Sequence, residues 1–224
     1  MPQGTITFIN DFQDGGKILP DSGPPEITFR HNIPGTGLNV GSCVTYELDA
    51  NGVAINLLSC SVVTCDITID TDTSGNQIVP EGKTLCVVNG ATLTGNIKTD
   101  GGNIIVKEGS TVTGNLKVDK GDTGTLGSIT IEGASTVGGN VKIDESSAIT
   151  VNGSTVSGNV KADETQDVKM DNNNVNGNVK VDDCNNVSVT GNTIGGNLKI
   201  DDTTGSCDSS STPNNVTGNV DGCP

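Results

Sequence analysis

Acidic residues recur at a fixed spacing in the C-terminal two-thirds of this 224-residue chain. Asp144, Asp163, Asp182 and Asp201 are each 19 residues apart, and a second acidic residue follows each of them. Calcium binds six to eight oxygen ligands in proteins, so stacked acidic doublets are a candidate calcium site. A lysine also precedes each aspartate by two positions. The alternative is a solvated surface on which lysine and aspartate columns form weak cross-strand ion pairs.

Thiol chemistry is the second candidate, because the chain has seven cysteines. The closest pair is Cys60 and Cys65, and the only histidine, His31, is far from both in sequence, which fits no zinc motif. The candidates for disulfides, within the chain or between copies, are Cys60, Cys65, Cys86, Cys184, Cys207 and Cys223.

The positions of these cysteines suggest two staples. Cys184 and Cys207 follow equivalent strands in adjacent repeats and are a candidate disulfide, while Cys60, Cys65 and Cys86 are candidates for closing the start of the repeat region. The odd total leaves one thiol free or available to a partner, and cysteine is also a common small core residue. Disulfides persist in oxidising compartments, so we expect an extracellular or cell-surface location, with the cytoplasm as the alternative.

The sequence contains no recognisable catalytic constellation. Beyond Tyr46 the chain has no aromatic residue, no histidine and no arginine. A nucleophile with its base, or a carbohydrate cleft lined by rings, requires residues of these types. We therefore expect a protein that is not an enzyme and that needs no cofactor.

A repeat must position all of these residues. Gly-Asn pairs begin at Gly75, Gly95, Gly114, Gly139, Gly158, Gly177, Gly196 and Gly218, most of them 19 residues apart. A unit this short cannot bury its own hydrophobic face, so copies must stack. The segments after each pair, such as 139–144, alternate apolar and polar residues, which is typical of strands.

We therefore predict an all-β chain whose repeats form a parallel, right-handed β-helix with coils of about 19 residues. Each coil has three short strands, which in one repeat point Val141 and Ile143, then Ile149 and Val151, and finally Val156 inward. Insertions around 120–127 and 203–214 fall between the first and second strands, at a corner where extra chain can loop outward.

The asparagine of each pair should form a ladder along the axis. Stacked asparagine side chains hydrogen-bond along a solenoid, and the preceding glycine permits a positive φ at a sharp corner. The predicted ladder consists of Asn96, Asn115, Asn140, Asn159, Asn178, Asn197 and Asn219.

The N-terminal segment is a separate predicted domain. Residues 4–10, 17–23, 25–35, 40–48 and 51–57 are typical of five strands separated by Gly/Pro turns, which a small β-barrel requires. We divide the chain into a barrel at 1–58, a junction at 59–74 and a solenoid at 75–224.

This N-terminal segment resembles the cold-shock domain, an oligonucleotide-binding (OB) barrel. The resemblance implies single-stranded nucleic-acid binding by stacked aromatic and basic side chains. The matching positions are Phe8, Lys17, Phe29, Arg30 and His31. The segment holds two basic residues against six acidic ones, and the whole chain has a formal charge of −15, which opposes nucleic-acid binding.

The Gly-Asn-Val motif of the repeats is similar to the repeats of bactofilins. This resemblance implies end-to-end polymerisation. A β-helix also exposes unpaired backbone groups at its ends unless they are capped. We therefore expect a structural protein that forms head-to-tail homopolymers, as filaments or a surface layer. The alternatives are a cold-shock-like nucleic-acid binder with a solenoid spacer and a cation- or ligand-binding adhesin-like module. No apolar run is long enough to span a membrane.

Overall fold

The computed structural model describes residues 3–9, 15–20, 25–30, 43–59 and 64–223. The chain forms two compact units, residues 1–64 and residues 65–224. Within the described residues every regular element is a β-strand, as predicted.

The N-terminal unit is an OB-like five-stranded barrel with the sheet order β1-β2-β3-β5-β4. Its strands are β1 (Gln3–Ile9), β2 (Gly15–Pro20), β3 (Ile27–Arg30), β4 (Cys43–Leu48) and β5 (Ala54–Ser59). Antiparallel pairing of β1 with β4 closes the barrel, and β3 and β5 pair in parallel. The buried core consists of Ile6, Ile18, Phe29, Val44, Tyr46 and Ala54. Each of the five predicted strands overlaps one of these strands, while their predicted residues 10, 21–23, 31–35 and 40–42 lie outside the described residues.

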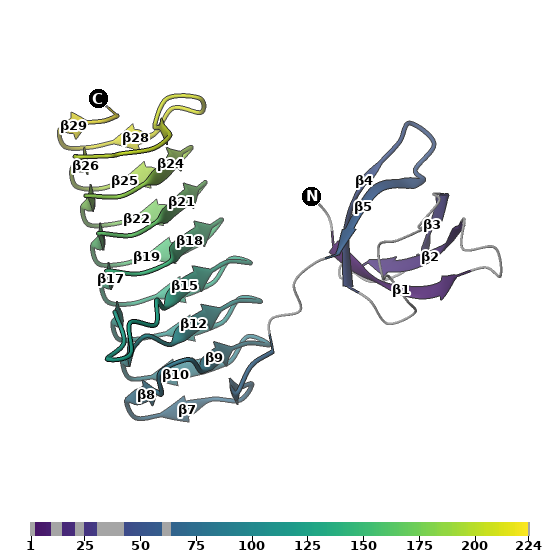
Figure 1. The fold of residues 1–224 in the computed structure, drawn as a ribbon, viewed down its shortest axis with the longest axis horizontal. Helices are drawn as coiled ribbons and strands as arrows, with labels where there is room; N and C mark the ends of the chain where they lie inside the picture. The colour runs from purple at the N-terminus through teal and green to yellow at the C-terminus, as the bar shows by residue number, and fades with distance from the viewer. Residues whose placement is uncertain (1–2, 10–14, 21–24, 31–42, 60–63, 224) are drawn as a thin grey trace. The chain divides into compact units, whose positions relative to one another are not determined.

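The second unit is a parallel β-solenoid made of three eight-stranded sheets (Figure 1). Sheet 1 contains β6 (Ile67–Ile69), β9 (Thr84–Val87), β12 (Asn103–Val106), β15 (Ser128–Ile131), β18 (Ala148–Asn152), β21 (Asp167–Asp171), β24 (Asn186–Thr190) and β27 (Cys207–Asp208). Sheet 2 contains β7 (Thr73–Ser74), β10 (Thr92–Thr94), β13 (Thr111–Val112), β16 (Thr136–Val137), β19 (Thr155–Val156), β22 (Asn174–Val175), β25 (Thr193–Ile194) and β28 (Asn215–Val216). Sheet 3 contains β8 (Gln77–Val79), β11 (Ile97–Asp100), β14 (Leu116–Asp119), β17 (Val141–Asp144), β20 (Val160–Asp163), β23 (Val179–Asp182), β26 (Leu198–Ile200) and β29 (Val220–Asp221).

Each coil contributes one strand to each sheet. Coil 1 is β6, β7 and β8, and coil 8 is β27, β28 and β29. The solenoid therefore begins before residue 75, because β6 and β7 fall within the segment predicted as a junction and pair with β9 and β10.

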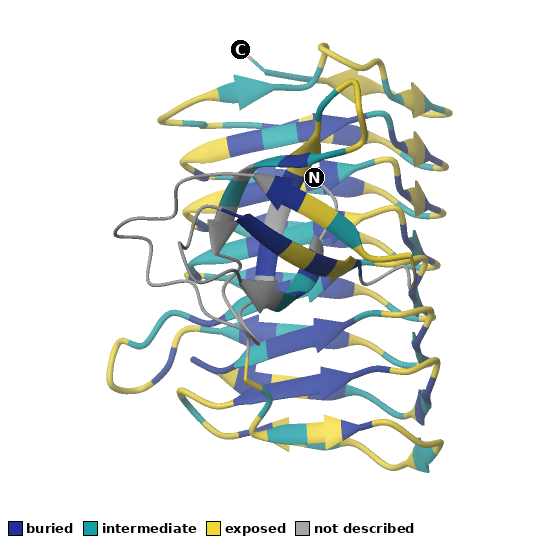
Figure 2. Cartoon of the chain, turned by 90° about the vertical axis from the view of Figure 1, so that its right-hand side faces the viewer, coloured by how far each residue is buried: buried dark blue, intermediate teal, exposed yellow. Residues whose placement is uncertain are grey.

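The solenoid core is one continuous apolar column. Val141, Ile143, Ile149, Val151 and Val156 are all at most 1% exposed, which confirms the predicted inward set. In-register stacking places similar side chains above one another. For example, Ile149 pairs with Ile129 of the coil before it. Figure 2 shows the buried positions along the inner coils, with more exposed and intermediate residues in the terminal ones.

The glycines at the Gly-Asn corners are needed for close stacking more than for a special backbone conformation. Only Gly75 and Gly95 among them have positive φ, so the expectation of a left-handed corner is wrong for the other six. A Cβ atom on Gly158 would lie 2.6 Å from the carbonyl oxygen of Gly139 one coil earlier. The backbones of successive coils thus approach too closely at this corner for any side chain.

The two insertions differ in their relation to the coils. Residues 120–127 connect β14 to β15, as predicted, and the backbone N–H and hydroxyl of Thr123 donate to the Glu81 carboxylate, which lowers the pKa of Glu81. The second insertion is not one outward loop, because Cys207–Asp208 within it form β27 in register with Val187 and Ser188.

Candidate functional site: ladders and ends of the solenoid

The asparagines of the Gly-Asn corners form a hydrogen-bonded ladder. The backbone N–H and side-chain Nδ2 of Asn159 both donate to Oδ1 of Asn140 in the preceding coil, each at 2.9 Å. The ladder starts one coil earlier than expected and consists of Asn76, Asn96, Asn115, Asn140, Asn159, Asn178, Asn197 and Asn219. Each Oδ1 atom within the ladder therefore accepts the backbone N–H that the next corner would otherwise leave unpaired.

The ladder has a direction, so its two ends differ chemically. Oδ1 of Asn76 accepts two hydrogen bonds from Asn96, each at 2.9 Å, yet no described residue accepts from the N–H or Nδ2 of Asn76. At the other end, the N–H of Asn219 donates to Asn197 Oδ1 at 2.7 Å, and no group in the described ranges donates to Oδ1 of Asn219. The N-terminal end of the ladder presents donors and the C-terminal end presents an acceptor.

A second, buried asparagine ladder was missed by sequence reasoning. Asn173 is 3% exposed, and its N–H and Nδ2 donate to Oδ1 of Asn192 at 2.9 Å. Asn192 donates in the same way to Asn214 of coil 8. This ladder runs in the opposite direction, toward the C-terminus. Its sequence signal is a polar residue two positions before each buried Val or Ile of sheet 2.

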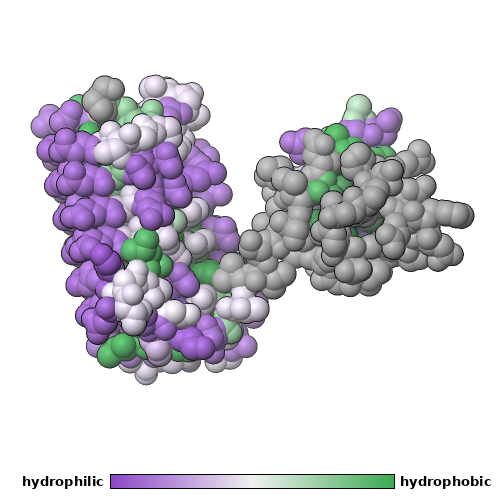
Figure 3. Space-filling model, in the orientation of Figure 1, coloured by the Kyte–Doolittle hydropathy of each residue, from purple (hydrophilic) through white to green (hydrophobic). Residues whose placement is uncertain are grey.

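Lysines of sheet 3 bind the aspartate of their own strand. Lys142 Nζ lies 2.7 Å from Asp144 Oδ2 but 4.0 Å from Asp119 of the preceding coil. The same pairing recurs as Lys98–Asp100, Lys117–Asp119, Lys161–Asp163, Lys180–Asp182 and Lys199–Asp201. The expectation of mainly cross-strand pairs is wrong, because residues i and i+2 of a strand lie on the same face, within reach of a lysine. Hydrophilic residues follow these strands along the left edge of the solenoid in Figure 3.

In two of these ion pairs the hydrogen bond shifts the pKa of a member. The hydrogen bond from Lys180 lowers the pKa of Asp182, and the same bond raises the pKa of Lys180. The bond to Asp201 likewise raises the pKa of Lys199. The carboxylates proposed as calcium ligands are therefore engaged by lysine ammonium groups.

The second residue of each acidic doublet forms a corner. Glu145, Glu164, Asp183 and Asp202 have φ between 41° and 50°, in the left-handed region. Their spacing thus follows from the backbone turn that ends each strand of sheet 3. Among the residues that the structure describes, no group of three or more His, Cys, Asp or Glu side chains is placed to hold a metal ion.

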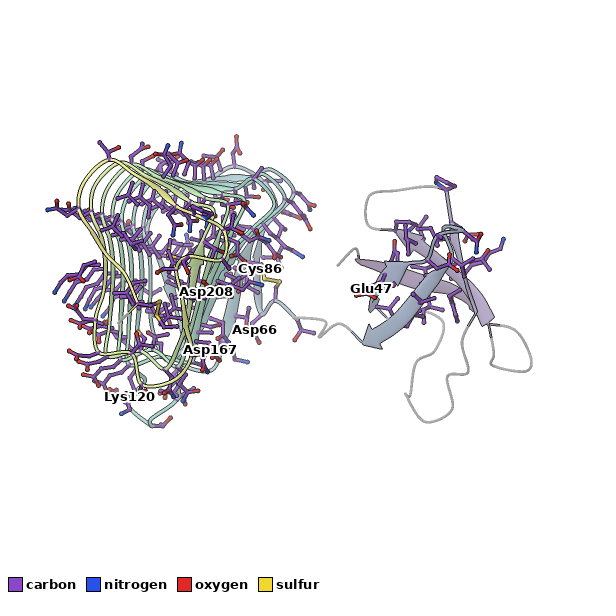
Figure 4. The ribbon with its side chains drawn as sticks, turned by 90° about the horizontal axis from the view of Figure 1, so that it is seen from above. Glu47, Asp66, Cys86, Lys120, Asp167 and Asp208 are labelled. Carbon is purple, nitrogen blue, oxygen red and sulfur yellow. A yellow bond between two sulfur atoms is a disulfide. The ribbon has the colours of Figure 1, made fainter. Side chains whose placement is uncertain are left out.

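Two disulfides staple the ends of the solenoid. Cys65 pairs with Cys86 of β9, and Cys207 of β27 pairs with Cys223, with Cα–Cα distances of 5.7 and 5.6 Å. In Figure 4, Cys86 and its disulfide lie at one side of the coils. Cys60 lies outside the described residues. Because Cys223 is bonded within the chain, its thiol is not available for a bond between copies.

The predicted Cys184–Cys207 disulfide is wrong. Cys184 is a free, fully buried thiol whose Sγ donates to the carbonyl of Asp182 at 3.1 Å. Ser146 and Thr165 make the equivalent bond in the two preceding coils, so Cys184 occupies a corner column of small hydroxyl-type residues. Burial raises the pKa of the Cys184 thiol.

The barrel residues matched to the cold-shock pattern are not gathered on one exposed surface. Phe29 is 0% exposed within the core, so its ring cannot stack on a base. Lys17 is exposed and forms an ion pair with Glu26 at 3.2 Å. Phe8 and Arg30 lie in β1 and β3, their side chains outside the described set, and His31 is outside the described residues.

The terminal coils expose surface that inner coils bury. Val220 takes the place of Leu198 in coil 8 but is 61% exposed. It borders a hollow of about 220 Å³ lined by Leu198, Ser209, Ser210, Pro213, Asn214, Val216 and Val220. Coil 1 instead presents Thr73 and Gln77 at the places of Leu93 and Ile97, with Ile78 beside them 79% exposed.

The fold defines a β-solenoid protein with an OB-like N-terminal barrel. No family model, no curated protein and no solved structure matches the chain. In the described ranges, no helix is long and apolar enough to cross a membrane.

Proposed function

We propose that this protein is a non-enzymatic structural rod that assembles end to end into filaments or a surface layer. The observation that carries the proposal is that each end of the solenoid has outermost strands with a neighbour on one side only. β6, β7 and β8 at one end, and β27, β28 and β29 at the other, are each the outermost strand of their sheet. Such edges template pairing with another chain unless they are blocked.

The C-terminal face has the composition of a contact surface. Val216, Val220 and Pro213 line its hollow beside the buried Leu198. A neighbouring coil would bury Val216 and Val220 as inner coils bury Ile194 and Leu198. Burial of apolar surface stabilises a contact by about 25 cal/mol per Å² before the entropy cost of association. The Cys207–Cys223 disulfide holds this last coil together, with both cysteines packed against the solenoid core.

The two disulfides support an oxidising location, and we place the protein outside the cell or on its surface. A cytoplasmic location remains the alternative hypothesis.

Single-stranded nucleic-acid binding is the second candidate function, which the OB-like strand order β1-β2-β3-β5-β4 favours. The burial of Phe29 and the pairing of Lys17 with Glu26 count against it. A cation- or ligand-binding module, with calcium at the aspartates of sheet 3, is third, because those aspartates are bound by lysine.

Negative-stain electron microscopy and sedimentation of the full chain at increasing concentration test the proposal. We expect filaments for the wild type and their loss in Val220→Lys, which places a charge at the C-terminal face. The matched control is Ser157→Lys, which adds the same charge at an exposed mid-rod position of coil 5. Single rods at every concentration, or filaments of Val220→Lys equal to those of the wild type, would overturn the proposal.

If the wild type forms only single rods, titration with a labelled oligothymidylate tests the nucleic-acid alternative. Saturable binding that weakens with salt would support that alternative.

A further inference from the structure

We infer that copies join head to tail and in register, so that Oδ1 of Asn219 in one copy accepts from the N–H and Nδ2 of Asn76 in the next. This inference rests on the proposed end-to-end assembly and specifies its polarity and contact residues. The partner is a second copy of this chain, and the surfaces are coil 8 and coil 1.

The direction of the outer asparagine ladder carries the argument. Every inner step has the same chemistry, in which an asparagine of one coil donates twice or once to Oδ1 of the coil before it. Coil 1 of an incoming copy, placed after coil 8, repeats this step, because Asn76 brings unpaired donors to the unpaired acceptor of Asn219. The inner steps of this ladder are exposed, so the same step between two copies adds hydrogen bonds at the edge of the contact and fixes its direction.

Joining two identical ends lacks this complementarity. Two N-terminal ends bring the Asn76 donors of both copies together, and two C-terminal ends bring two Asn219 oxygen acceptors together. The parallel hydrogen-bond pattern of the three sheets also continues only when both copies run in the same direction.

The side-chain columns of the two ends are compatible in this register. Val216 of coil 8 and Thr73 of coil 1 belong to one inward column, and Val220 and Gln77 to another. On the outside, Asp221 shares a column with Ile78.

In the proposed contact between two copies, Asp208 also lies in the same column as a neutral residue. It shares a column with Thr68, which lies opposite Cys86 in coil 2. The register therefore places neither Asp208 nor Asp221 directly opposite an acidic side chain, which matters for a chain of charge −15.

A charge-matched set of variants tests the polarity of the bond. Asn76→Asp keeps the oxygen that accepts from Asn96 but loses the Nδ2 donor, so we expect end-to-end association to weaken about tenfold or more. Asn219→Asp keeps the acceptor and makes it charged, so association should tighten. Ser157→Asp, away from both ends, should leave association unchanged. Measurements in about 1 M NaCl, where the screening length is about 3 Å, remove most of the general repulsion.

Cysteine cross-linking tests the register itself. Ile78→Cys mixed with Asp221→Cys should give a disulfide-linked dimer under oxidation, because the two positions share one column and neighbouring strands lie about 4.8 Å apart. Neither variant alone should cross-link.

The outcomes distinguish the proposed head-to-tail register from the proposed end-to-end assembly. Dimers from Ile78→Cys alone, or an Asn76→Asp association equal to that of Ser157→Asp, overturn the head-to-tail register while leaving assembly in place. A wild type that forms only single rods overturns both the register and the proposed function.

Discussion

At the scale of single residues, each asparagine of the outer ladder uses its Oδ1 atom to accept hydrogen bonds from the next coil. Oδ1 of Asn159 accepts from both the N–H and Nδ2 of Asn178 in the next coil, each within 2.9 Å. The same asparagine donates to Asn140. Each position therefore links three coils, which explains why one residue type recurs at every corner.

Replacing an inner asparagine of the ladder should destabilise the solenoid. Asn159→Ala leaves the backbone N–H of Asn178 without its acceptor at an exposed position, and we expect a loss of about 0.5–1.5 kcal/mol in the free energy of unfolding for each hydrogen bond removed. The control is Asn174→Ala, since Asn174 is exposed one coil away and its side chain makes no hydrogen bond within the described residues; its effect should stay within about 0.5 kcal/mol. Equilibrium urea unfolding measures both, and equal values for the two variants would contradict the ladder's role.

Cys184 shows how a residue type can mislead when its surroundings are unknown. Its thiol replaces a hydroxyl in a column that Ser146 and Thr165 occupy, and it donates to a backbone carbonyl as they do. The side chain is thus a buried hydrogen-bond donor, and its partner is the carbonyl of Asp182 at the end of the preceding strand β23.

At the scale of elements, the corner before each strand of sheet 3 depends on the close approach of successive backbones. Gly158→Ala would place a Cβ 2.6 Å from Gly139 O and 2.7 Å from Asn140 Oδ1, and we expect it to cost about 3 kcal/mol. Gly153→Ala is the control, because its Cβ meets nothing within 4 Å and only its φ of 57° is unfavourable, at about 1–2 kcal/mol. Thermal unfolding should rank Gly158→Ala as the less stable; the reverse order would show that conformation outweighs contact.

The strands of sheet 3 should also make stability depend on pH. Asp182 has a lowered pKa because Lys180 donates to it, so its contribution is complete above the ordinary carboxyl pKa of about 4 and is lost as pH falls through the lowered value. Lys180 has a raised pKa, so its contribution is complete below the ordinary lysine pKa of about 10.4 and is lost as pH rises through the raised value.

We therefore expect a plateau of unfolding free energy between about pH 5 and pH 10, with losses on both sides. Urea unfolding across pH measures it. In Asp182→Asn the decline on the acid side should become shallower than in the wild type. An unchanged acid profile in this variant would show that the pair contributes nothing to the pH dependence.

At the scale of the whole molecule, a solenoid is stabilised by contacts between adjacent coils, so its terminal coils are its weakest part. Coil 8 has a neighbour on one side only, and the Cys207–Cys223 disulfide closes a segment with a sequence separation of 16. Closing a loop of this length contributes about 3 kcal/mol by restricting the unfolded chain.

Removing that disulfide should loosen one end alone. In Cys207→Ser/Cys223→Ser we expect faster amide hydrogen exchange in β28 and β29, with exchange in β17 to β20 unchanged. The matched variant Cys65→Ser/Cys86→Ser should instead affect coils 1 and 2. Hydrogen-exchange mass spectrometry measures both, and equal acceleration along the whole solenoid would contradict a model of nearest-neighbour coupling.

Much of this architecture follows from local patterns in the chain. The alternation at Val141 and Ile143 predicts a strand with one buried face, and the 19-residue spacing predicts which residues stack. The five barrel strands follow from turn residues in the same way. Each of these inferences needs only residues close together in sequence, or an exact repeat of them.

The remaining features depend on side-chain contacts that the local pattern of the chain does not specify. The disulfide partners Cys207 and Cys223, the buried ladder from Asn173 to Asn214, and the burial of Phe29 were decided only by packing. The tertiary structure also decided that lysine pairs along its strand and that corner glycines serve contact. The sequence by itself determined the coil and its period, because these arise from side-chain alternation and from the spacing of the repeats. Only the stacked structure shows that the two ends of the ladder differ, because the direction of the hydrogen bonds is a property of the stack.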